Sequence, residues 1–188
     1  MKTVKAIVFS YAAILFLSSG MPYEHLITPP TDRPVYRQEQ EQKKPGPPRR
    51  MVPEEYRDLF TAAAAFAGIP PGALESIAWA ESRFCPEAKS PERDDECRDL
   101  GMFQFNSRYL GWYADRYNSG VPFDPMDTEE AIYIAAQHVR FLYECYGRWG
   151  DVFLAYNAGI GAVNRDEIPE SAIRYLLKIY EEKPDGNL

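Results

Sequence analysis

A glutamate at the end of an apolar run in residues 71–82 is the strongest candidate for chemistry in this chain. Residues at spacings of three and four share one helix face there: Leu74, Ile77, Ala78 and Glu81. Ionising a carboxyl group at the end of an apolar face is costly, so the pKa of Glu81 is expected to rise. A carboxylic acid that keeps its proton near neutral pH can protonate a leaving oxygen, as glycoside cleavage requires. The alternative is that Glu81 lies just past the core and is solvated; Glu75, on a different face, is expected at the surface.

Glu81 belongs to the first of three short segments with polar and glycine residues. The segments are Glu81-Ser82, Gly101-Met102-Phe103-Gln104 and Ala155-Tyr156-Asn157-Ala158-Gly159. In this order and spacing they resemble the lytic transglycosylases (SLT type) of the lysozyme-like superfamily, which cleave the glycan strands of bacterial peptidoglycan. The resemblance covers about residues 53 to 183. Each segment is a weak signal alone, whereas the ordered set is specific.

The resemblance assigns a role to each matching residue. Glu81 takes the place of the catalytic glutamate, and Ser82 that of a serine hydrogen-bonded near it. Tyr156 and Asn157 match a pair that contacts the glutamate and the bound sugar. Tyr175 is carried over from a pattern that is displaced by one residue in this chain. The alternative for Tyr156 is simple packing in the core.

The segment from Gly101 to Gln104 matches a sugar-binding turn of the family. The resemblance implies that Gly101 lets the backbone approach the sugar and that Gln104 bonds it. Met102 and Phe103 fill the two middle positions, which are large and apolar in the family as well. All four residues are therefore predicted to contribute to substrate binding.

The resemblance implies a reaction in which one carboxyl group acts twice. Glu81 protonates the oxygen between N-acetylmuramic acid and N-acetylglucosamine, while the acetamido group of the substrate stabilises the positive charge. The carboxylate then removes a proton from the muramyl C6 hydroxyl, which attacks C1 and closes a 1,6-anhydro ring. Intramolecular attack outcompetes water because its effective molarity is on the order of 10^5 M or more. No metal or organic cofactor is required.

Asp99 leaves a hydrolytic mechanism open. It stands just before Gly101, at a position where lytic transglycosylases commonly have small residues. Its separation from Glu81 is similar to that between the two carboxylates of hen-type lysozymes. In that interpretation the protein is a muramidase, and Asp99 supports an intermediate that water hydrolyses. The alternative is that Asp99 belongs to a solvated acidic loop. A third interpretation is a non-catalytic wall-binding assembly module on the same fold, against which the presence of Glu81 argues.

The elements that position these residues are predicted to be mostly α-helical, as in a lysozyme-like domain. Helices are expected from Pro53 to Gly68, Pro71 to Ser82, Asp127 to Gly147, Asp151 to Gly159 and Pro169 to just before Pro184. The last helix should present one apolar face, formed by Ile173, Leu176, Leu177 and Tyr180. A short β-hairpin is expected within residues 83–105. The predicted domain spans residues 53–184, followed by a tail at 185–188.

The first 52 residues are predicted to form two segments outside that domain. Residues 1–20 have a basic start, an apolar stretch and a small-residue end, as in an export signal. The apolar stretch is too short to span a bilayer comfortably, and an uncleaved anchor is the alternative. Residues 21–52 are rich in proline and lack periodic apolar positions, which predicts a flexible tether. The protein is thus expected to be exported to the periplasm or cell envelope.

Charge and aromatic content indicate the class of partner. The formal net charge of -7 argues against nucleic acid, whose binding needs basic faces. Thirteen Tyr, ten Phe and three Trp can supply the aromatic faces that grip sugars, so the glycan strands of peptidoglycan are the expected partner. By analogy, small members of the family open the wall for a secretion or conjugation apparatus or a flagellum.

Three cysteines support export. Cys85 and Cys97 bracket the loop between Glu81 and Gly101, and a disulfide between them would contribute about 3 kcal/mol. Cys145 is then left over, although pairing of Cys145 with either of the others is an open alternative. A zinc site is not expected, because His25 and His138 do not have ligand spacing, and His138 is expected on a helix surface.

Overall fold

The computed structural model describes residues 46–93 and 96–181, so the predicted export signal, most of the predicted tether and the tail lie outside it. Within these ranges the chain is mostly α-helical, which confirms the predicted class. The helices are α1 (Arg57–Ala67), α2 (Pro71–Ser82), α3 (Leu110–Tyr117), α4 (Thr128–Tyr146), α5 (Trp149–Ala158), α6 (Ile160–Asn164) and α7 (Glu170–Glu181). Short 3-10 turns at Glu54–Tyr56 and Ser107–Tyr109 precede α1 and α3. The strands β1 (Asp99–Leu100) and β2 (Phe105–Asn106) form the predicted hairpin.

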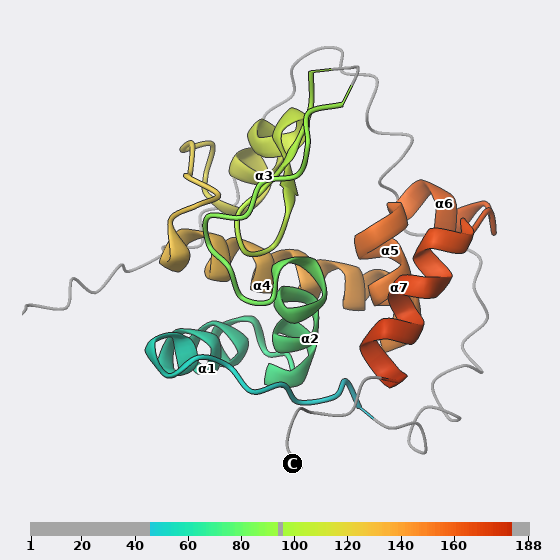
Figure 1. Ribbon diagram of the computed structural model, residues 1–188, viewed down its shortest axis with the longest axis horizontal. Helices are drawn as coiled ribbons and strands as arrows, with labels where there is room; N and C mark the ends of the chain where they lie inside the picture. The colour runs from blue at the N-terminus through green and yellow to red at the C-terminus, as the bar shows by residue number, and fades with distance from the viewer. Residues whose placement is uncertain (1–45, 94–95, 182–188) are drawn as a thin grey trace, which may run out of the picture.

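The longest helix, α4, forms the centre of the fold. It packs against α1, α2, α3 and α5, and it crosses the middle of the molecule between α1 and α3 (Figure 1). The side chain of Asp127 accepts a hydrogen bond of 2.9 Å from the backbone N–H of Glu130, and Gly147 ends the helix with φ +67°. The predicted apolar stripe is buried, at Ile132, Ala135, Val139, Leu142 and Tyr146.

Helix α2 is buried on every side from Gly72 to Ala80. Pro71 begins it at the first helical position, and Arg83 ends it in the left-handed conformation. Glu75 is only 2% exposed, so the expectation that it lies at the surface is wrong. A carboxylate can be buried here because the guanidinium of Arg49 pairs with it.

Residues 46–52, termed the strap, are part of the fold, whereas the sequence predicts a tether that continues to residue 52. The Arg49 guanidinium and the Glu75 carboxylate form two contacts of 2.8 Å, and the backbone N–H of Arg50 donates to Glu75 over 2.9 Å. The Ser76 hydroxyl donates to the carbonyl of Pro48 over 2.8 Å. The sequence did not predict this arrangement, because the strap is extended and is held by contacts with α2. A proline-rich segment of this kind has no periodic pattern of apolar residues that would indicate such contacts.

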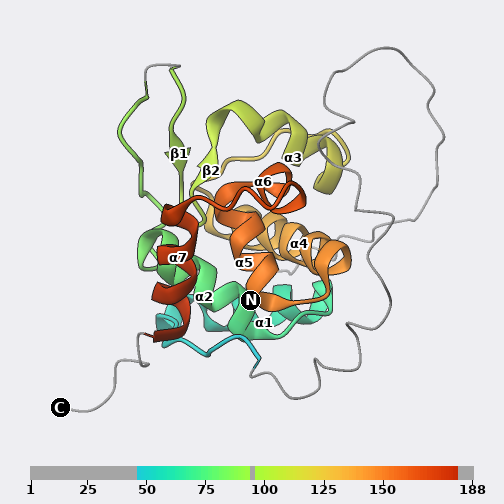
Figure 2. The same cartoon turned by 90° about the vertical axis from the view of Figure 1, so that its right-hand side faces the viewer.

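Helix α7 packs with a different face from the predicted one. Ile173, Leu177 and Tyr180 are exposed, by 46%, 45% and 39%. The buried side chains are Ala172, Tyr175 and Ile179. Apolar residues occur round most of this helix, so spacing alone allows two faces, and packing on α2 and α5 selects the one with the small Ala172. Figure 2 shows α7 alongside α2.

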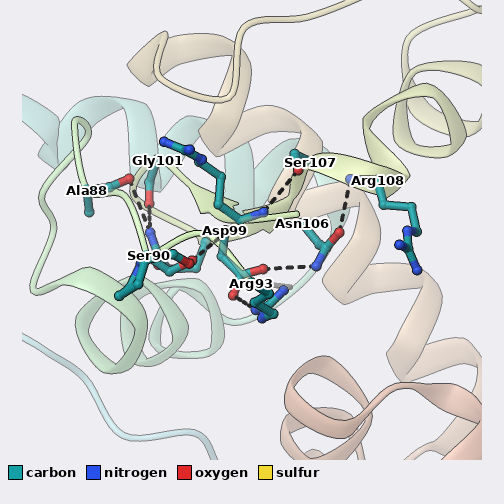
Figure 3. A network of polar contacts seen from close by, with 11 residues as sticks. Ala88, Ser90, Arg93, Asp99, Gly101, Asn106, Ser107 and Arg108 are labelled. Atoms are coloured by element: carbon teal, nitrogen blue, oxygen red, sulfur yellow. Dashed lines mark hydrogen bonds and ion pairs between the residues drawn. The ribbon is translucent and has the colours of Figure 1, made fainter. Parts of the chain in front are cut away.

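The hairpin is extended by a neighbouring loop. Asp99 pairs with Asn106 and Leu100 with Phe105, in antiparallel register. Residues 88–90 lie along β1, because the N–H of Gly101 donates to Ala88 over 2.8 Å and the N–H of Ser90 donates to Asp99 over 3.0 Å (Figure 3). Among the helices formed by the described residues, none combines the length and apolarity needed to cross a membrane.

Candidate active site

The three predicted segments meet at two neighbouring backbone carbonyl groups. The hydroxyl of Ser82, at the end of α2, donates to the carbonyl oxygen of Met102 over 2.7 Å. The hydroxyl of Tyr156, on α5, donates to the carbonyl oxygen of Phe103 over 2.9 Å. Residues far apart in the chain are thus joined through the turn between β1 and β2.

The geometry of that turn explains its glycine and glutamine. Gly101 has φ +74°, and a Cβ at this position would lie 1.8 Å from the carbonyl oxygen of Pro125. Only glycine fits, because both the dihedral angle and the contact exclude a side chain. Gln104 also has a left-handed backbone (φ +51°), and its side-chain amide donates to the carbonyls of Gly101 over 2.9 Å and Ala88 over 3.3 Å.

The side chains of Met102 and Phe103 are fully buried, so the expectation that they contact substrate needs correction. Phe103 stacks on Phe60 of α1, with ring centroids 6.0 Å apart. Both side chains therefore anchor the turn in the core, and what the turn offers the site is its backbone. Large apolar residues in these two positions are explained by packing.

Glu81 is half-buried at the end of α2, and its pKa is raised from 4.5 to about 7. Burial is the main cause, because a carboxylate loses hydration there, and the charge of Asp99 adds to the rise. The hydroxyl of Tyr175 and the ammonium of Lys178 act in the opposite direction by favouring the ionised form. Glu81 is therefore poised to hold or release a proton near neutral pH.

Tyr175 and Lys178 reach Glu81 from α7. Tyr175 is buried, and apart from its interaction with Glu81, its hydroxyl finds no hydrogen-bond partner among the described residues. The ammonium of Lys178 donates to the carbonyl oxygen of Ala80 over 2.6 Å, which holds its charge beside Glu81. The bond also satisfies one of the carbonyl groups at the end of α2.

The comparison with known families agrees with this geometry. Residues 58–172 match the family model described as the transglycosylase SLT domain. The chain belongs to this family. It is also 34% identical over 122 residues to the peptidoglycan transglycosylase gp16 of Escherichia phage T7, an alignment that covers 63% of this chain and 9% of that protein. The chain thus spans about a tenth of the length of that relative.

Asp99 of the SLT domain is held in a polar network at the base of the hairpin (Figure 3). One carboxylate oxygen accepts a hydrogen bond of 3.2 Å from the Asn106 amide, and the other pairs with Arg93. Its backbone N–H donates to the Ser90 hydroxyl over 2.8 Å. Asp99 is therefore held by several polar contacts, and its charge raises the pKa of Glu81.

Two aromatic residues of the SLT domain complete the surroundings of Glu81. Burial raises the pKa of Tyr113 on α3, and the charges of Glu81 and Asp99 raise it further. Burial likewise raises the pKa of Tyr156, with smaller contributions from Tyr113, Glu81 and Asp99. Asn157, next to Tyr156, is exposed.

The sequence motifs did not predict Tyr113 and Lys178 as neighbours of Glu81. The only sequence signal for Tyr113 is the density of aromatic residues in 109–117.

His138 lies inside an aromatic cluster and not on a helix surface, which corrects the expectation. It is buried on α4, and burial lowers its pKa to about 3, with a further contribution from Arg116. Its Nδ1 lies 2.9 Å from the Tyr117 hydroxyl. Neighbouring rings surround it, from Trp112, Tyr113, Phe141 and Tyr156.

The cysteines of the SLT domain are not joined to one another, although the backbone N–H of Cys85 donates to the Ser82 hydroxyl over 3.0 Å. No disulfide joins Cys85, Cys97 and Cys145 in the structure, with Cys85 exposed and Cys97 buried. Within the part of the chain described, no group of three or more His, Cys, Asp or Glu could hold a metal ion. A pocket of about 410 Å³ opens between α4, α5 and α7, and its lining contains none of the predicted site residues.

Proposed function

We propose that this protein is a peptidoglycan lytic transglycosylase in which Glu81 serves as both acid and base. The observation that carries the proposal is the half-buried Glu81 carboxyl with a pKa of about 7. General acid–base catalysis is most effective when the pKa of the group lies near the working pH. The family match and the relative named as a peptidoglycan transglycosylase support the same activity.

In the first step, protonated Glu81 gives its proton to the glycosidic oxygen between N-acetylmuramic acid and N-acetylglucosamine. The bond to muramyl C1 breaks, and the acetamido group of the substrate stabilises the positive charge. Tyr175 and Lys178 favour the carboxylate that remains, because both lower the pKa of Glu81. Burial opposes them, so that neither form of the carboxyl is strongly preferred.

In the second step, the Glu81 carboxylate removes the proton from the muramyl C6 hydroxyl. The oxygen attacks C1 of the same sugar, which closes the 1,6-anhydro ring and returns the proton to Glu81. Ser82 and Tyr156 contribute by fixing the turn at residues 102–103. Gln104, Asn157 and Tyr175 are proposed to contact the glycan; the single proton of the Tyr175 hydroxyl favours ionised Glu81, so this oxygen would accept a hydrogen bond from the sugar.

A hydrolytic muramidase is the second candidate, favoured by one observation. Asp99 is near enough to raise the pKa of Glu81, as a second carboxylate must be in a two-carboxylate mechanism. However, Asp99 already pairs with Arg93 and accepts a hydrogen bond from Asn106, which reduces its availability as a nucleophile. The anhydro product is therefore proposed. A non-catalytic module would leave the raised pKa of Glu81 without a use.

The place of action belongs to the same proposal. An enzyme that cleaves wall glycan must reach the cell envelope, in agreement with the export signal predicted for residues 1–20. Local wall opening for a secretion, conjugation or flagellar apparatus is the proposed use. The Cys85–Cys97 disulfide would then form after export, because disulfides persist in oxidising compartments. Non-reducing peptide mapping of the exported protein tests that bond.

Digestion of purified peptidoglycan sacculi tests the activity. The wild-type protein should release soluble glycan fragments, and Glu81→Gln should release almost none, because the amide keeps the shape but cannot give up the proton. Glu55→Gln makes the same chemical change at an exposed position and serves as the matched control. Substantial lysis by folded Glu81→Gln would refute the role of Glu81.

A further inference from the structure

Two segments outside the family match meet beside the candidate active site. The match covers residues 58–172, whereas the strap is residues 46–52 and most of α7 follows residue 172. The strap and α7 are at opposite ends of the described chain, yet both contact α2, which carries Glu81. Their contacts with each other are therefore a feature of this chain that the family match does not include.

The strap is fixed firmly to the first half of α2. Arg49 pairs with the buried carboxylate of Glu75, and Ser76 donates to the carbonyl of Pro48. Gly72 allows the closest approach, since a Cβ there would lie 2.5 Å from the carbonyl oxygen of Pro47. These contacts set the position of the strap without involving α7.

Arg50 extends from the strap to α7. It is only 7% exposed, and its guanidinium carbon lies 4.2 Å from the ring centroid of Trp79 on α2. Its Nη2 donates to the carbonyl oxygen of Ile179 on α7 over 2.5 Å. A planar guanidinium can stack on a ring and donate at its edge together, which a lysine cannot do. A buried charge with this geometry joins the two helices.

The turn of α7 that Arg50 holds is the turn that reaches Glu81. Ile179 directly follows Lys178 and lies about one helical turn after Tyr175. Lys178 donates to Ala80, the residue before Glu81, and Tyr175 faces the carboxyl. A shift of this turn away from α2 would move both groups away from Glu81.

We propose that Arg50 is a positioning residue, which holds α7 on α2 so that Tyr175 and Lys178 stay beside Glu81. An effect of Arg50 on catalysis rests on the acid–base role proposed for Glu81. The geometric link itself does not depend on the reaction. It can therefore be tested on the free protein.

The charged and titratable groups that face Glu81 come from four elements. They are Asp99 on β1, Tyr113 on α3, Tyr156 on α5, and Tyr175 and Lys178 on α7. Of these, Lys178 carries the positive charge, which favours ionised Glu81. Replacing it with methionine removes that charge, so the pKa of Glu81 should rise.

The test measures how far this rise depends on Arg50. The pKa of Glu81 is determined by carbon NMR of its carboxyl group in the full chain, with no substrate present. Lys178→Met is made in three backgrounds, which are the wild type, Arg50→Ala and Arg174→Ala. Arg174→Ala is the matched control, because it also removes an arginine charge, but Arg174 is exposed on α7 and pairs with Glu170 of the same helix.

Lys178→Met should raise the pKa of Glu81 equally in the wild-type and Arg174→Ala backgrounds. In the Arg50→Ala background the rise should be less than about half of that in the wild-type background, because the effects of substituting residues that act through one another are not additive. In an Arg50→Lys background, which keeps the charge, the rise should lie between the values for the wild type and Arg50→Ala. Arg50→Lys replaces Arg50→Ala if Arg50→Ala does not fold. An equal rise in every background would overturn the proposal, whether or not the protein cleaves glycan.

Discussion

The hydroxyl of Tyr156 donates a hydrogen bond to the backbone carbonyl oxygen of Phe103, 2.9 Å away. This bond ties α5 to the turn between β1 and β2. Ser82 makes the corresponding bond from α2 to the neighbouring carbonyl of Met102. The turn is thus held from both α2 and α5. These bonds fix the position of β1, which carries Asp99, relative to the end of α2, which carries Glu81.

The rate of glycan cleavage should fall as the pH rises through about 7. The protonated form of Glu81 starts the reaction, and its pKa is raised from 4.5 to about 7, mainly by burial. Tyr175→Phe removes a hydroxyl that lowers this pKa, so the limb of the kcat/KM profile should move to higher pH. A limb near 4.5 in the wild type would contradict the assignment.

Glu81→Gln should stabilise the protein at high pH. The folded state holds the Glu81 proton between pH 4.5 and about 7, where the unfolded state has lost it, so stability falls as the pH rises across that window. The substitution removes this loss and should raise the free energy of unfolding by on the order of 2 kcal/mol at pH 8. At pH 4 the gain should be absent.

Thermal unfolding of Glu81→Gln and of the exposed control Glu55→Gln at both pH values checks this prediction. The control should show no comparable dependence on pH, because Glu55 is exposed. A stabilisation of Glu81→Gln that is equal at pH 4 and pH 8 would mean that Glu81 is not protonated over the expected window.

Gly101→Ala should destabilise the fold by on the order of 3 kcal/mol or more. Its Cβ would lie 1.8 Å from the carbonyl oxygen of Pro125, and φ is +74°. Gly111→Ala is the matched control, since nothing lies within 4 Å of the added Cβ and the position is helical. That change should be neutral or stabilising by up to about 1 kcal/mol. Equal chemical-denaturation midpoints for the two variants would contradict the structure.

Asp99→Asn should keep most of the activity, with a loss of less than about tenfold. The charge of Asp99 raises the pKa of Glu81, so removing it should lower that pKa and leave less of the acid form at neutral pH. A mechanism that needs Asp99 in every turnover predicts a loss on the order of a thousandfold. Initial rates on sacculi at pH 6 and pH 8 separate the two cases.

Features with a local pattern could be predicted from the sequence. Helix α4 is an example, because the cap at Asp127 and the buried stripe leave visible spacing. Local spacing did not predict burial where a side chain is covered by residues that are distant in the sequence. Glu75 can be buried because Arg49 pairs with it, and His138 lies among aromatic rings that α3 and α5 supply. The motifs predicted Glu81, but Lys178 belongs to the site through a contact between helices that no local pattern contains.

Mass spectrometry of the glycan ends released from purified peptidoglycan distinguishes a lytic transglycosylase from a hydrolytic muramidase. Attack by the muramyl C6 hydroxyl leaves 1,6-anhydro ends, and Glu81 alone supplies the proton transfers. Anhydro ends should therefore dominate for the wild-type protein and for Asp99→Asn. Reducing ends, heavier by one water, together with loss of activity in Asp99→Asn, would contradict it and identify the protein as a hydrolytic muramidase.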